Sequence, residues 1–384
     1  MYTSKKISFS KLIFYLALLV FCGLIFIKPI LPNPQFKLDN GLVNQDSNTR
    51  IFESFIIPEP EFLITSHSAT FTILPNNNLK AMWFAGSHEG KPDVKIWQSE
   101  FNGESWSRAT DILSPEILGA NTKRFIKKVG NPVVYRAENG ILHLFVVSVS
   151  IGGWSGSSLN HFTSSDDGLT WQYKDKLILS PFFNFSTLDR TIPITLADGG
   201  FYLPVYHEFI HAYPELLRFD ANGNFINQIR MTSKIHLLQP SIVSINSDKA
   251  YSFLRNSGQI DDVLYMQKTN NGGLKWSNPE STNIKNHDSS IATVNLGSLG
   301  ILMVHNPSGR NQLVLSISKD AKTWRQFYVL ESSENGEFSY PVVKVHDHLV
   351  DILYTWNRKG IKHVRFNKLW LDSQLNRQSK SWNI

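Results

Sequence analysis

Cysteine is almost missing from this chain of 384 residues. The one cysteine, Cys22, lies in an apolar stretch near the N-terminus, and no other follows it. Disulfide bonds and thiolate metal sites are therefore excluded from the remaining chain. The histidines lack paired ligand spacing on one element, so we expect no metal and no other cofactor.

Charged residues are also scarce, at 18% of the chain against 42% hydrophobic residues. This balance argues against a disordered chain and allows a large core. The net charge of +6 and the pI near 9.1 suit an anionic partner such as a membrane surface or an acidic sugar, although a diffusely basic surface explains them more simply. Because the chain has no long run of lysine or arginine and no nucleic-acid motif, we expect no nucleic-acid partner.

A long uncharged run is found at residues 12–27, after three lysines within the first eleven residues. It falls short of the roughly 20 residues of a spanning helix, but tilting and snorkelling flanks can extend it. Basic residues before such a run predict a cytoplasmic N-terminus. We therefore expect a cytoplasmic tail at residues 1–11 and a signal-anchor transmembrane helix at residues 12–31, with a cleaved signal peptide as the alternative. The protein is then expected in a bacterial inner membrane, single-pass, with the remaining chain on the periplasmic side.

The chain after this segment shows no convincing long amphipathic helix. Short apolar runs separated by turns rich in Gly, Asn and Pro instead predict an all-β protein. We expect a polar linker at residues 32–48, the β domain at residues 49–372 and a polar C-terminal tail at residues 373–384.

One turn sequence recurs before apolar strands, with the pattern Ser/Thr-x-Asp/Asn-x-Gly-x-Thr-Trp. The acidic or amide side chain accepts backbone hydrogen bonds, Gly supplies a positive φ, and Trp anchors the turn on the sheet. A spacing near 50 residues predicts a six-bladed β-propeller with four strands in each blade, and a β-sandwich is the main alternative. The copies lie at residues 99–106, 164–171, 269–276 and 318–324.

The repeated turn resembles the Asp box, or bacterial neuraminidase (BNR) repeat, of the sialidase superfamily. Other segments resemble a bacterial group of predicted neuraminidases within that superfamily. These segments are residues 67–76, 83–97, 130–133, 152–160, 203–209, 239–241 and 337–341. The resemblance implies a propeller of sialidase type over nearly the whole β domain, and it predicts the fold better than the activity.

Sialidases hold the substrate carboxylate with three arginines, because a guanidinium offers a rigid fork to a carboxylate. The resemblance implies that Arg255 and Arg310 are two of them. His67 stands where the third is expected, and a histidine cannot form that fork. Sialidases also use a tyrosine nucleophile, an exception among glycosidases. Phe338 occupies its expected position, so we take Tyr340, two residues on and on the same side of a strand, as the candidate.

The resemblance further implies an acid/base carboxylate at Asp93, with Glu89 as the alternative, since both lie in a Gly- and Pro-containing turn. Gln239 falls where a glutamate partner of the tyrosine is expected, and it can orient a phenol but cannot take its proton. Further candidates for substrate binding are His88, Arg190 and Glu208, with His207 and Lys128 as additional candidate contacts.

The function that this resemblance implies is removal of a terminal α-linked 2-keto-3-deoxy acid sugar, either sialic acid or Kdo, from envelope glycans. One alternative is a hydrolase or lyase of another acidic polysaccharide that uses Glu208, His207 and Tyr206. The other is a non-catalytic glycan-binding propeller, which His67 and Phe338 favour. The sequence identifies no partner subunit.

Overall fold

The computed structural model describes residues 9–26, 33–38, 41–43, 49–180, 184, 186–258 and 261–380. The chain divides into two compact units, residues 1–33 and 34–384. The first contains helix α1 (Phe9–Phe26). Of the expected tail and anchor, residues 1–8 and 27–31 lie outside the described residues. Among those described, no helix combines the length and hydropathy needed to cross a membrane, so the expected membrane helix gains no support here.

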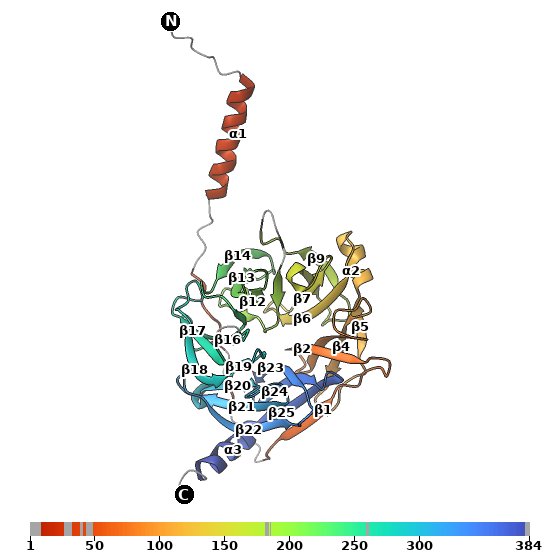
Figure 1. Ribbon diagram of the computed structural model, residues 1–384, viewed down its shortest axis with the longest axis vertical. Helices are drawn as coiled ribbons and strands as arrows, with labels where there is room; N and C mark the ends of the chain where they lie inside the picture. The colour runs from red at the N-terminus through yellow and green to blue at the C-terminus, as the bar shows by residue number, and fades with distance from the viewer. Residues whose placement is uncertain are drawn as a thin grey trace. The chain divides into compact units, whose positions relative to one another are not determined.

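The second unit is a six-bladed β-propeller, as the sequence predicted, with antiparallel strand pairs in every blade (Figure 1). Blade 1 contains β2 (Thr65–Ile73), β3 (Leu79–Gly86), β4 (Lys95–Phe101) and β5 (Thr110–Leu113). Blade 2 contains β6 (Lys128–Arg136), β7 (Leu142–Val149), β8 (Ser157–Ser164) and β9 (Gln172–Lys176). Blade 3 contains β10 (Thr187–Asp189), β11 (Ile194–Thr195), β12 (Phe201–His207), β13 (Tyr213–Phe219) and β14 (Phe225–Arg230).

The remaining blades follow the same order from the inner to the outer strand. Blade 4 contains β15 (Leu237–Ser244), β16 (Ala250–Asn256), β17 (Val263–Thr269) and β18 (Glu280–Lys285). Blade 5 contains β19 (Ala292–Asn295), β20 (Ile301–His305), β21 (Gln312–Ser318) and β22 (Arg325–Ser332). Blade 6 contains β23 (Phe338–His346), β24 (Leu349–Trp356), β25 (Gly360–Asn367) and, as its outer strand, β1 (Phe52–Ile56).

Blade 6 closes the ring by joining the two ends of the propeller sequence. Strand β1 pairs with β25 from Phe52 opposite Phe366 to Ile56 opposite Lys362, and the two strands lie side by side in Figure 1. Strand β1 comes before blade 1 in the sequence but completes the sheet of blade 6. Its backbone hydrogen bonds with β25 therefore link the first blade to the last and close the ring. The sequence did not predict that β1 would belong to blade 6.

The segment expected to be a linker packs against the propeller where it is described. Phe36 is 2% exposed, and its amide donates to the Ser247 carbonyl at 2.7 Å. Leu42 is 7% exposed in the core between blades 5 and 6. Gly272 has a φ of +66°, and a Cβ there would lie 1.7 Å from the Pro34 carbonyl oxygen, so only glycine admits this crossing. We call residues 34–38 and 41–43 the N-terminal strap.

The four repeated turns occupy one position in their blades, between the third and fourth strands. In the copy at residues 164–171, Asp166 Oδ1 accepts from the Thr170 amide at 2.9 Å, and Ser164 Oγ accepts from the Gly168 amide at 2.9 Å. In blade 4, Asn271 stands at the position that Asp166 has in blade 2, and its Oδ1 accepts from the Lys275 amide at 3.0 Å. Blade 6 has no such turn, because its fourth strand is β1.

The inner strands carry bulges with backbones in the left-handed region. Asn131, Gln239 and Tyr340 have φ of 39°, 46° and 54°, and each precedes a proline, although residues before proline ordinarily take extended conformations. Each lies where the pairing with the second strand shifts register. Such strain of roughly 1–3 kcal/mol per residue persists only where the surrounding structure holds it, and it often marks a site.

Helices outside α1 are short and peripheral. Helix α2 (Pro115–Thr122) begins at Ser114, whose Oγ accepts from the Ile117 amide at 3.2 Å. The expected C-terminal tail is helical as far as it is described, in α3 (Lys368–Lys380). Trp370 stacks on Phe52 with 4.5 Å between ring centroids, so this helix covers the β1 closure. The 3₁₀ turns η1 (Trp154–Gly156) and η2 (Gly297–Leu299) complete the described elements.

Candidate active site

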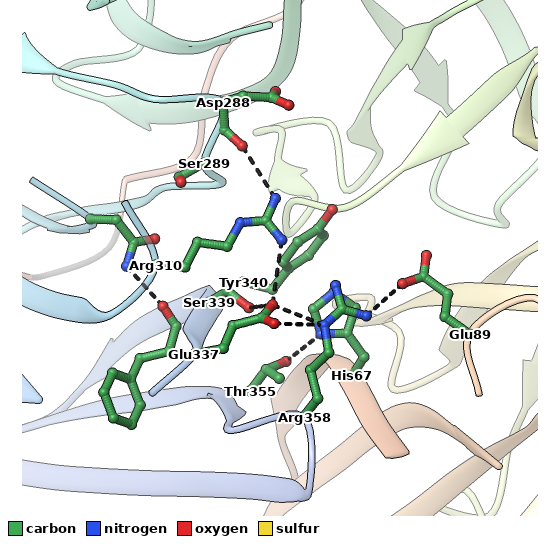
Figure 2. A network of polar contacts seen from close by, with 12 residues as sticks. His67, Glu89, Asp288, Ser289, Arg310, Glu337, Ser339, Tyr340, Thr355 and Arg358 are labelled. Carbon is green, nitrogen blue, oxygen red and sulfur yellow. Dashed lines mark hydrogen bonds and ion pairs between the residues drawn. The ribbon is translucent and has the colours of Figure 1, made fainter. Parts of the chain in front are cut away.

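Tyr340 stands at the centre of a cluster of charged side chains at one end of the inner strands (Figure 2). The guanidinium carbons of three arginines lie close to its ring centroid: Arg190 at 5.1 Å, Arg310 at 5.6 Å and Arg255 at 5.9 Å. They reach it from blades 3, 5 and 4, while Tyr340 comes from the bulge of β23 in blade 6. The twist at the bulge turns a side chain that would otherwise follow the strand alternation toward these arginines.

Arg255 is held by hydrogen bonds on every side. Its Nη1 donates to the Tyr340 hydroxyl at 3.3 Å and to Gln239 Oε1 at 3.0 Å. Its Nε and Nη2 each reach Asp288 Oδ1 at 2.8 Å. Only 8% of the residue is exposed, so its charge acts on Tyr340 with little screening by water.

Arg358 was not foreseen and extends the cluster. It lies in the turn between β24 and β25 with a φ of +53°. Its Nε donates to both oxygens of Glu337 at 2.9 Å, and its Nη1 donates to Glu89 at 2.7 Å. Glu337 also faces Arg310 Nη1 at 3.4 Å, and Figure 2 shows this carboxylate between the two guanidiniums. Arg310 and Arg358 thus add two guanidinium groups to the cluster, and both contact Glu337.

Arg190 and His67 are two buried neighbours of the Tyr340 ring. Arg190 donates to the backbone carbonyls of Ala69 and Pro341, each at 3.1 Å, and to that of Tyr340. These bonds occupy backbone oxygens exposed by the bulge, so Arg190 has a structural part here besides its charge. The rings of His67 and Tyr340 have centroids 4.3 Å apart, and His67 Nδ1 shares a hydrogen bond of 2.9 Å with Thr355.

The concentration of positive charge sets the ionisation of the site. Burial raises the pKa of Tyr340, but Arg255 and Arg310 outweigh it and the pKa lies below its usual value near 10. Burial and the arginines, first among them Arg358, hold the pKa of His67 well below its usual range. His67 is therefore neutral near pH 7. It cannot supply the third positive charge, whereas Arg358 can.

Gln239 connects Arg255 to a second tyrosine. Its Nε2 donates to the Tyr206 hydroxyl at 3.2 Å, while its Oε1 accepts from Arg255. Burial raises the pKa of Tyr206 well above 10, so this phenol stays protonated. Glu208 follows β12, and burial raises its pKa against the opposing effect of Arg255. The raised pKa favours the protonated form of this carboxyl group.

The remaining candidates lie away from these contacts. Asp93 is exposed and caps its turn, accepting from the Ser87 amide at 2.7 Å and the Ser87 hydroxyl at 2.8 Å. His88 is exposed in the same turn. Lys128 lies 3.8 Å from the Trp154 ring centroid, and His207 stacks on Tyr213 with 4.8 Å between centroids. Glu89, in contrast, reaches the cluster through Arg358.

Three charged residues of the cluster escaped the sequence reasoning: Asp288, Glu337 and Arg358. Asp288 and Arg358 lie in turns with positive φ, where Asp and Arg look like ordinary surface residues. The only available signal was indirect, since a clamp that lacks one arginine invites a search for another. Among the described residues, no group of three or more His, Cys, Asp and Glu could hold a metal ion.

Solved structures share this fold at low sequence identity. A protein of unknown function from Dyadobacter fermentans matches with a TM-score of 0.67 at 13% identity, over 82% of this chain and 98% of that one. NanB sialidase from Streptococcus pneumoniae matches with a TM-score of 0.64 at 11% identity, over 82% and 70%. Trypanosoma rangeli sialidase in complex with the inhibitor DANA matches with a TM-score of 0.64 at 13% identity, over 87% of this chain and 62% of that one.

At these identities the likeness shows a sialidase-like propeller and no more. The match to this chain covers less than two thirds of the length of the Trypanosoma rangeli sialidase. In sequence, none of the curated proteins compared with the chain matches it. The BNR repeat-like domain matches residues 77–352, which is well over half of the chain and includes all four repeated turns. The chain therefore belongs to the BNR repeat-like domain family.

Proposed function

We propose that this protein is a retaining exo-glycosidase for a terminal α-linked 2-keto-3-deoxy acid sugar, with Tyr340 as the nucleophile. The observation that carries the proposal is the Tyr340 phenol, hydrogen-bonded by Arg255 and surrounded by guanidiniums. A phenol whose pKa is lowered supplies more phenolate at neutral pH. A tyrosine nucleophile is the exception that sialidases make among glycosidases.

The lowered pKa of Tyr340 matters because Gln239 cannot act as a base for this phenol. An amide cannot accept the phenol proton, so the site lacks a base where a glutamate was expected. In our proposal the charges of Arg255 and Arg310 replace that base, because they stabilise the phenolate directly. Gln239 then acts by orienting Arg255, to which it is bonded at 3.0 Å.

The substrate carboxylate is proposed to bind beside Arg310 and Arg358. Both guanidiniums are about 27–28% exposed in their side chains, so an anion can approach them, whereas Arg255 is buried. Glu337 lies between them and holds them in place, and an entering carboxylate would use their remaining donors.

The leaving oxygen needs a proton as its bond to the anomeric carbon breaks. We assign this role to Glu208, since burial raises its pKa and so favours the protonated acid. Water then hydrolyses the tyrosyl–sugar bond, and Glu208 takes a proton from that water. Asp93 is less suited as a donor, because its bonds from Ser87 outweigh its slight burial and lower its pKa.

Direct assay with 4-methylumbelliferyl glycosides of sialic acid and of Kdo tests this function. Release of the fluorophore, with a sugar adduct on the peptide that contains Tyr340 when a 3-fluoro analogue is used, is the expected result. Turnover with an adduct on another residue would refute the assignment of Tyr340.

A non-catalytic glycan-binding propeller is the second candidate, and neutral His67 together with Gln239 favours it. It predicts binding of the free acid sugar, lost on substitution of Arg310, without release of any fluorophore. The location on the periplasmic side of a bacterial inner membrane stays a prediction from residues 1–31 and is not needed for either function.

A further inference from the structure

A cavity of about 260 Å³ lies at the other end of the inner strands from Tyr340. All six blades contribute the final residues of an inner strand or the residues beside it. The lining side chains used below are Lys37, Thr72, Arg136, Ser244, Asn295 and Lys344. None of the residues in contact with Tyr340 belongs to this lining, so the cavity is separate from the candidate active site.

The charge of the lining has one sign. The described residues that line it include Lys37, Arg136 and Lys344, and none of these lining residues is acidic. Glu138 stands outside the lining and pairs with Lys37. Among the described residues, the side chains that line this concave, partly enclosed space are thus basic where they are charged. Low-dielectric walls around such a space strengthen its attraction for an anion.

Arg136 carries the strongest indication of a ligand. It ends strand β6, and its buried Nε has no hydrogen-bond partner. No ion pair of Arg136 occurs among the described residues. A guanidinium that is only part-exposed and unpaired loses solvation without compensation. A bound oxyanion would supply the missing acceptor and the opposite charge.

The N-terminal strap completes the cavity. The Lys37 amide donates to the Thr195 carbonyl at 3.0 Å, which fixes the strap across blade 3 and brings the Lys37 side chain to the cavity. Around the cations stand hydroxyl and amide groups, among them Thr72, Ser244 and Asn295. Hydroxyls can donate to an anion, and the Asn295 amide already bonds the Ser244 carbonyl at 3.0 Å.

We propose that this cavity binds a small oxyanion, a phosphate or sulfate group, through Arg136, Lys344 and Lys37. The volume suits a single such group or one carried on a monosaccharide, and excludes an extended glycan chain. The proposal does not depend on catalysis, because it uses no residue of the Tyr340 cluster. It gives the propeller a second site on its axis, at the end where the repeated turns lie.

Isothermal titration calorimetry of the full chain with inorganic phosphate and with sulfate, at low ionic strength, tests the proposal. We expect saturable binding at a site that depends on Arg136. Arg136→Gln should weaken the binding by roughly tenfold or more, because a charged hydrogen bond is lost. Lys37→Gln, on the exposed strap, provides a second variant if Arg136→Gln does not fold. Arg255→Gln is the matched control and should leave the phosphate affinity unchanged.

Two results overturn the proposal. One is the absence of saturable binding by either anion. The other is binding that survives Arg136→Gln and Lys37→Gln but disappears in Arg255→Gln, which would place the anion at the Tyr340 cluster. Glucose 6-phosphate and glucose 6-sulfate, compared with the inorganic anions, then distinguish a sugar-borne group from a free ion. Tighter binding of either sugar ester identifies the carried group as the ligand.

Discussion

Arg255 Nη1 donates to the Tyr340 hydroxyl at 3.3 Å and to Gln239 Oε1 at 3.0 Å. One nitrogen of blade 4 therefore links the phenol of blade 6 to an amide of its own blade. Because Asp288 holds the other side of the guanidinium, Arg255 has little freedom to turn away from Tyr340. The phenol is thus placed in a fixed positive field before any substrate arrives, which is the condition for electrostatic preorganisation.

Removing the Tyr340 hydroxyl tests the nucleophile. Tyr340→Phe should lower kcat by roughly a thousandfold or more, since the covalent step is lost, while the ring and its contacts remain. Hydrolysis of the fluorogenic substrate and binding of the free sugar are the measurements. Tyr202→Phe is the matched control, because the Tyr202 hydroxyl bonds Gly272 in another part of the propeller. Equal loss in both variants would indicate a folding effect.

The ionisation of Tyr340 should respond to its arginine neighbours. The lowered pKa means that one tyrosinate forms at a pH below the usual value near 10. Arg310→Gln removes one positive charge, so the same transition should move to higher pH. Ultraviolet absorbance during an alkaline titration follows it, with Tyr340→Phe identifying the group. A transition that Arg310→Gln leaves in place would contradict the field that we assign to Arg310.

Arg358 should matter for substrate affinity more than for folding. In Arg358→Gln, Glu337 is free to pair more fully with Arg310, and one guanidinium is lost from the proposed carboxylate site. We expect KM to rise by about tenfold, with a smaller change in kcat. Lys359→Gln, at the exposed neighbouring position, is the control for charge alone. A rise in KM of the same size in both variants would speak against a specific role.

Glu59 should make folding stability depend on pH. Burial raises its pKa from 4.5 to about 7. Between these values the unfolded chain ionises while the folded protein keeps the proton, so the free energy of unfolding falls as pH rises, by about 3 kcal/mol in all. Urea unfolding at pH 4.5 and at pH 7 measures the change. Glu59→Gln should remove most of it, whereas Glu61→Gln, exposed two residues further on, should keep it.

Asp351 should be essential to blade 6. This carboxylate is fully buried and accepts from His363 Nε2 at 2.7 Å and from Arg365 Nε at 2.6 Å. Asp351→Asn leaves the Arg365 charge buried without its partner, which should cost roughly 3–5 kcal/mol of unfolding free energy. Chemical denaturation compares it with Asp347→Asn, in an exposed turn whose φ of 53° asparagine tolerates. Similar stability of the two variants would show that the buried charge is not needed.

The sequence could predict the propeller because its repeated turns are made by local chemistry. Asp166 and Thr170 lie four residues apart, so the hydrogen bond between them needs no distant part of the chain. The spacing of such turns sets the number of blades. By the same reasoning β1 was missed, because its partner β25 lies roughly 300 residues away and β1 carries no turn signal of its own.

The candidate site divides in the same way. The resemblance to a family was enough to single out Tyr340, Arg255 and Arg310, since it implies where arginines and a tyrosine should stand. Arg358 and Asp288 became visible only in the folded chain, where closure of the ring brings blades 4, 5 and 6 to one axis. The strained backbone that aims Tyr340 at Arg255 likewise depends on Arg190, which holds the carbonyls of the bulge from blade 3. Local turn chemistry therefore determined the repeat, and long-range closure decided which charges meet around the phenol.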